Sequence, residues 1–389
     1  MKPAPRPPNH YRLRLPGPVA VPSRVLQATA APVLNHRGPE FRAIVAAVQE
    51  RIQPVIGTEN SVMFFASSGT GVMEASLVNI GAPGESVLVC INGQFGTRFA
   101  SIAKSLGLQV DGLEFEWGTA IRPQPVADRL KEKTYRAVIL VHNESSTGVI
   151  ADIEAIGKVV RETPSLFIVD SVSGLGGISM RQDEWRVDVL VSASQKALMC
   201  PPGLALVSAS AKAREVIQRD DRFPRFYWDF RGVLTSLEAN ETPFTAPVSL
   251  MAGLLASLEL MHEEGLPEVL RRHHELASAF RGGAVALGFR IYGQADSLSD
   301  TVVALQVPEG IDGGDIVRRL YHEHHTVIAG SRNKLNGQVI RIGTMGDFDL
   351  SDVLLDLAYL QEALQHLGVN VQPGAAIAAA LSSIKKGKI

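Results

Sequence analysis

The stretch VSASQKALMCPPG, residues 191–203, decides the fold expected of this chain. It continues a β-branched run that begins at Val187, and such a run indicates a buried strand. Lys196 follows this strand among apolar neighbours, and Pro-Pro-Gly ends the segment. A buried ammonium is costly unless it is paired or used. Lys196 is therefore either a snorkelling surface lysine or a chemically active group.

Composition limits the class of protein. The chain has 389 residues, of which 46% are hydrophobic and 20% charged, as in a soluble globular protein of two domains. The 38 basic and 40 acidic residues nearly cancel, which gives no support for binding to nucleic acid or to a membrane surface. Cys90 and Cys200 form no framework, so we expect a cytoplasmic protein. We expect no targeting segment and no membrane span, because the start is proline-rich and no apolar run approaches roughly 20 residues.

Apolar runs alternate with helical patterns along the first 245 residues. We expect strands over residues 62–66, 86–91, 108–113, 137–142, 165–169, 187–192 and 204–208. We expect helices over residues 41–53, 71–80, 97–106 and 153–161, where apolar residues recur three or four apart. This alternation predicts an α/β fold whose large domain is doubly wound around a mainly parallel sheet.

The pattern changes after about residue 245. Helical periodicity covers residues 248–262, 268–287 and 350–367, and strands are expected over 289–292, 301–307, 326–329 and 339–342. We therefore divide the chain into an N-terminal arm (1–18), a large domain (19–247), a smaller C-terminal α+β domain (248–370) and a tail (371–389). The tail is expected to fray or to form a weak helix.

Ligands of open α/β sheets bind outside the carboxyl ends of the strands, so the residues after each strand matter most. SSGTG, residues 67–71, opens a helix with small residues, which indicates an anion cradle. NGQFG, residues 92–96, places Phe95 either over a flat ligand ring or simply in the core. HNESSTG, residues 142–148, is dense in hydroxyls, although an isolated copy would be a capped turn.

The segment FIVDSVSGLGG, residues 167–177, places Asp170 after apolar residues. A buried carboxylate needs a cation, which is either a protonated ring nitrogen of a ligand or a structural partner. Gly174, Gly176 and Gly177 lack the full spacing of a dinucleotide fingerprint. The run His322–His325 lacks HExxH spacing, so we expect a helix terminus there and no metal site.

One ligand explains the cradle, the aromatic ring, the carboxylate and the lysine together. A phosphorylated pyridine aldehyde needs its phosphate held, its ring stacked and its ring nitrogen kept protonated by a carboxylate. Its aldehyde also needs an amine with which to form a Schiff base. Burial lowers the pKa of such an amine, which helps both bonding and proton transfer. The sequence therefore predicts pyridoxal 5′-phosphate as cofactor, bonded to Lys196.

The order of SSGTG, NGQFG, HNESSTG, VDSVSGLGG, SASQKALMCPPG and RIGTMG resembles class V aminotransferases of the pyridoxal phosphate fold type I superfamily. The resemblance is specifically to the alanine/serine–glyoxylate aminotransferase group, and it runs from LPGPVAVPSRV near residue 15 to RIGTMG near residue 346. It implies ping-pong transfer of an amino group from serine or alanine to glyoxylate or pyruvate, in a homodimer with shared active sites.

Other functions remain open at this point. Within the superfamily the donor could be ureidoglycine or aminoethylphosphonate, whereas a desulfurase would need a catalytic loop cysteine that we do not find. Outside it, the alternatives are an NAD-dependent oxidoreductase, which leaves Lys196 and Arg341 unexplained, and a non-catalytic subunit. The intact Lys196 and Asp170 argue against the last.

The resemblance also implies roles for individual residues. Lys196 is the Schiff-base lysine and Asp170 pairs with the pyridine nitrogen. The remaining cofactor-binding residues are Ser68, Gly69, Thr70, Gly71, Phe95, Ser145, Gln195 and, from the neighbouring subunit, Thr245. Arg341 matches the arginine that binds the substrate carboxylate, although a strand arginine is also a candidate for a structural ion pair. Ser145 and Gly17, within a loop that closes over the substrate, complete the substrate side.

Three positions depart from the family pattern. Phe95 stands where relatives often carry tryptophan, which keeps the stacking. Thr242 replaces a phosphate-binding tyrosine and so weakens the expected contact between subunits. Val72 stands where some relatives have histidine, and we expect a difference in polarity on the cofactor side.

Overall fold

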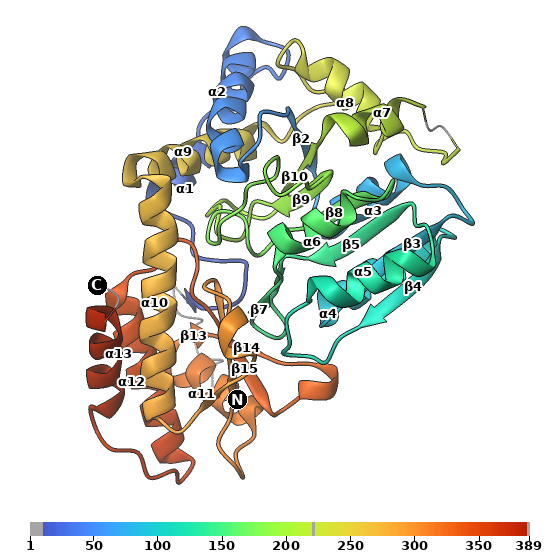
Figure 1. Ribbon diagram of the computed structural model, residues 1–389. Coiled ribbons are helices and arrows are strands. Elements are labelled where there is room, and N and C mark those ends of the chain that lie inside the picture. The colour runs from blue at the N-terminus through green and yellow to red at the C-terminus, as the bar shows by residue number, and fades with distance from the viewer. Residues whose placement is uncertain (1–10, 220–221, 387–389) are drawn as a thin grey trace, which may run out of the picture.

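Two hydrophobic cores organise the chain. The computed structural model describes residues 11–219 and 222–386, so the first ten residues of the expected arm lie outside the described part (Figure 1). The larger core is built from residues 41–269 and the smaller from residues 276–380. Within the described part, none of the helices is both long and apolar enough to cross a membrane.

A seven-stranded sheet forms the centre of the large domain. Its strands are β2 (Val62–Ala66), β3 (Ser86–Ile91), β4 (Gln109–Glu114), β5 (Ala137–Val141), β8 (Leu166–Asp170), β9 (Val189–Ala193) and β10 (Leu204–Ala209). They lie in the order β2-β10-β9-β8-β5-β3-β4. β10 pairs antiparallel with both β2 and β9, so β2 runs in the direction of the parallel strands. The sheet is mainly parallel, which confirms the predicted fold class.

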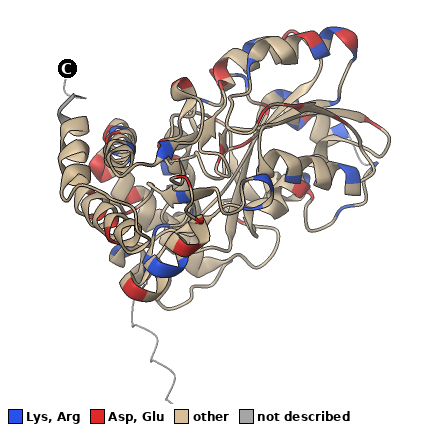
Figure 2. Ribbon diagram, turned by 90° about the horizontal axis from the view of Figure 1, so that it is seen from below, with Lys and Arg blue, Asp and Glu red and all other residues tan. Residues whose placement is uncertain are grey.

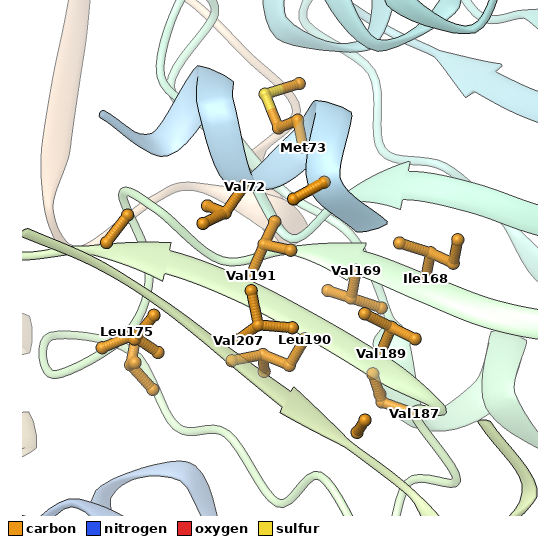
Figure 3. Close-up of a cluster of buried hydrophobic side chains, with 14 of the residues drawn as sticks. Val72, Met73, Ile168, Val169, Leu175, Val187, Val189, Leu190, Val191 and Val207 are labelled. Atoms are coloured by element: carbon orange, nitrogen blue, oxygen red, sulfur yellow. The ribbon is translucent and has the colours of Figure 1, made fainter. Parts of the chain in front are cut away.

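The helices of the large domain pack through apolar faces. They are α1 (Ser23–Thr29), α2 (Pro39–Ile56), α3 (Gly69–Ile80), α4 (Gln94–Ser105), α5 (Pro123–Glu132), α6 (Ile153–Val160), α7 (Ala211–Arg219), α8 (Phe230–Leu237) and α9 (Val248–Glu264). α3, α4 and α8 pack on the sheet, whereas α1 packs against α9. Figure 3 shows Val72 on the side of α3 that faces Val191 of the sheet. The central strands β5, β8, β9 and β10 are buried on both faces, as their continuous apolar runs predict, whereas the edge strand β4 is partly exposed.

The small domain combines an antiparallel sheet with helices. Its strands are β11 (Arg290–Ile291), β12 (Val302–Gln306), β14 (Ala329–Gly330) and β15 (Val339–Gly343), in the order β11-β12-β15-β14. Its helices are α10 (Leu266–Ala286), α11 (Gly313–His324), α12 (Leu350–His366) and α13 (Ala375–Lys386). α10 joins the domains, because Val269 belongs to the larger core and Leu276 to the smaller. α9 also packs in the larger core, so this core extends beyond residue 247, where we expected the large domain to end.

The N-terminal arm is attached to the small domain. β1 (Arg12–Leu13) pairs in parallel with β13 (Thr326–Val327). Arg12 and Arg14 form ion pairs with Asp356 of α12 at 2.9 and 3.0 Å. Burial raises the pKa of the Asp356 carboxyl to about 7, and the two guanidinium groups oppose that rise. Figure 2 shows acidic and basic residues interspersed along the outer helices, without a face of one sign in that view.

The last helix, α13, packs against α10. Ala376 and Ala380 are buried in the smaller core. α10 presents a glycine at this contact, because a Cβ at Gly283 would lie 2.3 Å from Cδ1 of Leu357 and 3.0 Å from the Ala376 carbonyl oxygen. The tail therefore forms a packed helix, where the sequence indicated fraying or a weak helix, because small residues on both helices allow close approach.

Replacement of Gly283 by leucine is expected to lower the free energy of unfolding by about 1–3 kcal/mol, because the side chain overpacks this contact. Urea denaturation measures the effect. Val285→Ala provides the control, since Val285 is 54% exposed on the same helix, and it should change stability by about 0.5 kcal/mol or less. Equal stability of the two variants would contradict the packing of α13.

Candidate active site

The carboxyl ends of the parallel strands bring the predicted catalytic residues to one edge of the sheet. Asp170 is the last residue of β8, and Lys196 follows the end of β9. Their residues are only 3% and 8% exposed. The charge of Asp170 raises the pKa of Lys196, and the charge of Lys196 lowers the pKa of Asp170. The two side chains therefore interact across the site.

Lys196 is enclosed by the N-terminal arm. Its Nζ donates a hydrogen bond to the carbonyl oxygen of Pro16. Burial lowers the pKa of the amine to about 8, even though Asp170 raises it. Gly17 has φ +94°, and a Cβ there would lie 2.3 Å from Cδ of Lys196. The structure thus places the loop of Gly17 directly against the lysine.

The Asp170 carboxylate can accept further hydrogen bonds or a cationic partner. Its Oδ1 accepts a hydrogen bond of 2.8 Å from the backbone N–H of Val172. Burial raises the pKa of this carboxyl to about 6. Among the described side chains none forms an ion pair with Asp170. A cationic ligand group is what such a carboxylate can accept.

The SSGTG turn forms a tight entry to α3. Ser68 precedes the helix and makes no side-chain capping hydrogen bond, so N–H groups of the first turn are available to a ligand. A Cβ at Gly71 would lie 2.1 Å from Oγ of Ser67, and one at Gly69 would lie 2.7 Å from Cγ2 of Val172. A side chain at either position would therefore force these neighbouring side chains to move. This arrangement can hold an anion.

Gln195 and Phe95 line the same edge. The Oε1 atom of Gln195 is buried without a hydrogen-bond partner, so the amide has an unmet bonding capacity that a ligand can satisfy. Phe95 is half-buried at the start of α4, and the guanidinium carbon of Arg98 lies 4.7 Å from its ring centroid. Nη1 of Arg98 donates to Oγ1 of Thr70 at 3.2 Å.

Arg341 of β15 reaches across from the small domain. Nη1 donates to the Ser145 carbonyl oxygen at 3.0 Å, and Nη2 donates to the Gly330 carbonyl oxygen at 2.8 Å. Nε is buried without a partner. Because a guanidinium has five N–H groups, three remain for a ligand. The structure therefore brings Arg341 and Ser145 together at the junction of the domains.

Residues 23–344 match the family Aminotransferase class-V. The chain belongs to this family. It is 38% identical to a protein from Synechococcus sp. named soluble hydrogenase, small subunit, covering 95% of this chain and 97% of that one. It is 34% identical to serine–glyoxylate aminotransferase of Methylorubrum extorquens over 99% of both chains. The structure of ureidoglycine–glyoxylate aminotransferase from Bacillus subtilis has a TM-score of 0.92 and 30% identity, covering 98% of this chain and all of that one.

This chain is thus a pyridoxal 5′-phosphate-dependent aminotransferase, and its residues fit that cofactor. Asp170 offers an unpaired carboxylate to a protonated ring nitrogen, and the start of α3 offers N–H groups to a phosphate. Gln195 has a buried atom without a partner. The lysine amine lies at the same edge of the sheet as these groups.

Other predicted positions of the aminotransferase lie elsewhere. Thr245 is exposed, and Thr242 is buried with its Oγ1 donating to the Phe244 carbonyl oxygen at 2.7 Å. A contact of Thr245 with a neighbouring subunit stays a prediction. Val72 is fully buried in the core between α3 and the sheet. The expected difference in polarity on the cofactor side stays a prediction.

Neither the glycines considered for a dinucleotide nor the histidines considered for a metal form such a site in the described residues. Gly174, Gly176 and Gly177 lie in turns between β8 and β9, and residues 171–188 contain no helix, whereas a dinucleotide fingerprint opens one. His324 ends α11 and its Nε2 lies 2.9 Å from Oε2 of Glu362. Within the described residues, no group of three or more His, Cys, Asp or Glu side chains is placed to hold a metal ion.

Sequence reasoning assigned no role to Arg98 or Glu144. Arg98 follows Phe95 by three residues, and this helical spacing was an available signal. Glu144 accepts hydrogen bonds from the backbone N–H groups of Phe95 and Gly96 at 2.9 and 3.2 Å. Its only signal was a carboxylate within the hydroxyl-rich HNESSTG turn.

The lowered pKa of Lys196 predicts an unusual pH dependence of labelling in the cofactor-free protein. Only the neutral amine attacks fluorodinitrobenzene, so labelling of Lys196 should rise with a midpoint near pH 8. An ordinary lysine, with a pKa of about 10.4, reacts at higher pH. Peptide mass spectrometry measures the extent of labelling at each lysine. Restricted access of the reagent to Lys196 would slow its labelling at every pH but would not move the pH midpoint. A midpoint near pH 10 for Lys196 would show that burial does not perturb it.

Proposed function

We propose that this aminotransferase moves an amino group from serine or alanine to glyoxylate or pyruvate by a ping-pong mechanism. The observation that carries the proposal is the meeting of Lys196 and Asp170 with Arg341 at the junction of the two domains. The Methylorubrum and Bacillus proteins both have glyoxylate in their names, which supports glyoxylate as acceptor.

The proposed chemistry divides between the cofactor and the protein. When bound, pyridoxal phosphate supplies an aldehyde that takes up the amino group and a ring that accepts electrons from the substrate Cα. Lys196 would hold the cofactor through its amine. With a pKa near 8, that amine, when free, could hold or move a proton at the substrate Cα. Asp170 keeps the ring nitrogen protonated by placing a negative charge beside it.

Arg341 binds the α-carboxylate of donor and acceptor in turn. A guanidinium fork matches a carboxylate through two parallel hydrogen bonds. Because one arginine serves both substrates, the oxo acid formed from the donor leaves before the acceptor enters, which is ping-pong order. Ser145 and Gly17 border this position, and the loop of Gly17 excludes water from Lys196.

The remaining assignments concern the cofactor. The proposed phosphate-binding residues are Ser68, Gly69, Thr70 and Gly71. Gln195 and Ser145 contact the cofactor, and Phe95 stacks on its ring. The partner subunit's Thr245 completes the phosphate site in a homodimer. The buried free thiols of Cys90 and Cys200 suit a reducing compartment, which supports the cytoplasm as location.

Two specific observations favour other candidates. The structural likeness to ureidoglycine–glyoxylate aminotransferase makes ureidoglycine an alternative donor. The name of the Synechococcus relative makes a non-catalytic subunit an alternative role, although Lys196 and Asp170 are both present here. A donor screen with glyoxylate as acceptor separates serine, alanine and ureidoglycine, and the absence of turnover with each would favour the subunit.

Borohydride reduction of the cofactor-loaded protein should attach pyridoxal phosphate to Lys196, because its amine is placed to bond the aldehyde. Peptide mass spectrometry identifies the labelled residue. Lys196→Ala should lose the label while the fold is kept, as circular dichroism would check. A label on another lysine in the unaltered protein would defeat the assignment.

Substitution of Arg341 by lysine should lower kcat/KM on the order of tenfold or more in each half-reaction, since a charged hydrogen bond contributes roughly 1.5–3 kcal/mol. Stopped-flow rates with serine, alanine, glyoxylate and pyruvate measure this. Arg281→Lys is the control, because Arg281 is also a part-buried small-domain arginine that donates to a backbone carbonyl. If donors are slowed but acceptors are not, Arg341 is not the common carboxylate anchor.

A further inference from the structure

Glu144 is a fully buried carboxylate beside the site described above. It lies in β6 (Asn143–Glu144), which pairs with β7 (Val149–Ile150) in a short hairpin after β5. Burial raises the pKa of its carboxyl, and the hydrogen bonds that it accepts oppose that rise. A buried carboxylate is retained only where its oxygens are well bonded. The bonds of Glu144 therefore indicate what it holds.

Both oxygens of Glu144 are occupied. Oε2 accepts the N–H groups of Phe95 at 2.9 Å and Gly96 at 3.2 Å. Oε1 accepts the N–H of Ser146 at 3.1 Å and its hydroxyl at 2.6 Å. A Cβ at Gly93 would lie 2.4 Å from Cγ of Glu144. The carboxylate is thus pressed against the N-terminus of α4, where a negative charge is favoured.

On the cofactor side, these bonds fix the first turn of α4. Phe95 and Arg98 project from that turn, and the guanidinium of Arg98 lies over the Phe95 ring and bonds to Thr70 of the SSGTG turn. Oγ of Ser146 also accepts the N–H of Gln94 at 2.9 Å, which adds a second tie to the same turn. A shift of Glu144 would therefore move the ring and the guanidinium together.

On the substrate side, the next residue carries the contact to the small domain. The carbonyl oxygen of Ser145 accepts Nη1 of Arg341 at 3.0 Å. Burial lowers the pKa of Arg341, and the negative charge of Glu144 opposes that shift, so Glu144 favours the charged guanidinium. The same carboxylate acts on Asp170, whose pKa it raises.

We propose that Glu144 is a positioning residue that ties the turn carrying Phe95 to the turn carrying Ser145, so that one carboxylate sets the place of both the cofactor-stacking ring and the substrate arginine. The inference rests on the proposed function, which assigns Phe95 to the cofactor and Arg341 to the substrate. Glu144 acts through these neighbours by hydrogen bonds to the backbone.

Glu144→Gln tests this proposal with little change of shape. A glutamine has only one acceptor oxygen, so its NH₂ group must face backbone N–H donors, either those of Phe95 and Gly96 or that of Ser146. We expect the Kd of the cofactor-free protein for pyridoxal phosphate to rise at least tenfold, as measured by fluorescence titration. We also expect KM for donor and acceptor to rise by more than kcat falls.

A double-mutant cycle with Phe95→Leu separates positioning from general damage. If Glu144 acts through Phe95, the loss of cofactor affinity caused by Phe95→Leu should be much smaller in the Glu144→Gln background. Should Glu144→Gln fail to fold, Ser146→Ala keeps the carboxylate but removes the hydroxyl bonds to Glu144 and Gln94. Ser146→Ala should also raise the Kd for pyridoxal phosphate, by a smaller factor than Glu144→Gln.

Asp188→Asn is the matched control. Asp188 is a buried carboxylate that accepts the N–H of Phe167 at 2.9 Å and the hydroxyl of Ser210 at 2.7 Å, but it precedes β9 at the opposite edge of the sheet. We expect it to lower Tm and to leave the cofactor Kd unchanged. The proposal is overturned if Glu144→Gln leaves Kd and KM unchanged, matches Asp188→Asn, or adds fully to Phe95→Leu. Failure of the unaltered protein to bind pyridoxal phosphate would instead overturn the proposed function.

Discussion

The cost of burying one amine constrains the rest of this site. Lys196 is buried, and desolvation is the main reason that the pKa of its amine falls to about 8. Arg341 and Arg98 contribute to this lowering, whereas the negative charge of Asp170 opposes it and the Pro16 carbonyl accepts a hydrogen bond from the amine. Asp170 can act on Lys196 because β8 and β9 are neighbours in the sheet. Pro16 can accept the hydrogen bond of the amine because the N-terminal arm passes over the ends of these strands.

The strands of the large domain could be predicted because their continuous apolar runs depend only on burial. The direction of β10 could not be predicted, since an antiparallel strand that is buried on both faces has the same composition as its parallel neighbours. α5 was missed because its ten residues include two prolines and bury only Val126. α13 was expected to be weak because its packing depends on glycines of α10, far away in the sequence.

The candidate site follows the same division. Asp170 and Lys196 could be found because each stands at the end of a strand, where an isolated charge needs a reason. Glu144 gained a function only in three dimensions, since its partner Phe95 is 49 residues away. The contact of Lys196 with Pro16 spans 180 residues. Sequence spacing reports local neighbours, whereas these contacts depend on how strands and domains are arranged.

The attachment of the arm to α12 has a consequence for the order in which the chain assembles. Arg12 is synthesised well before its partner Asp352, which follows 340 residues later. The larger core draws only on residues 41–269, and domains generally fold as units during synthesis. A nascent chain can therefore hold a formed sheet with Lys196 in place before the Pro16 carbonyl is anchored over it. Completion of the site therefore waits for the synthesis of α12, which carries the partners of the arm.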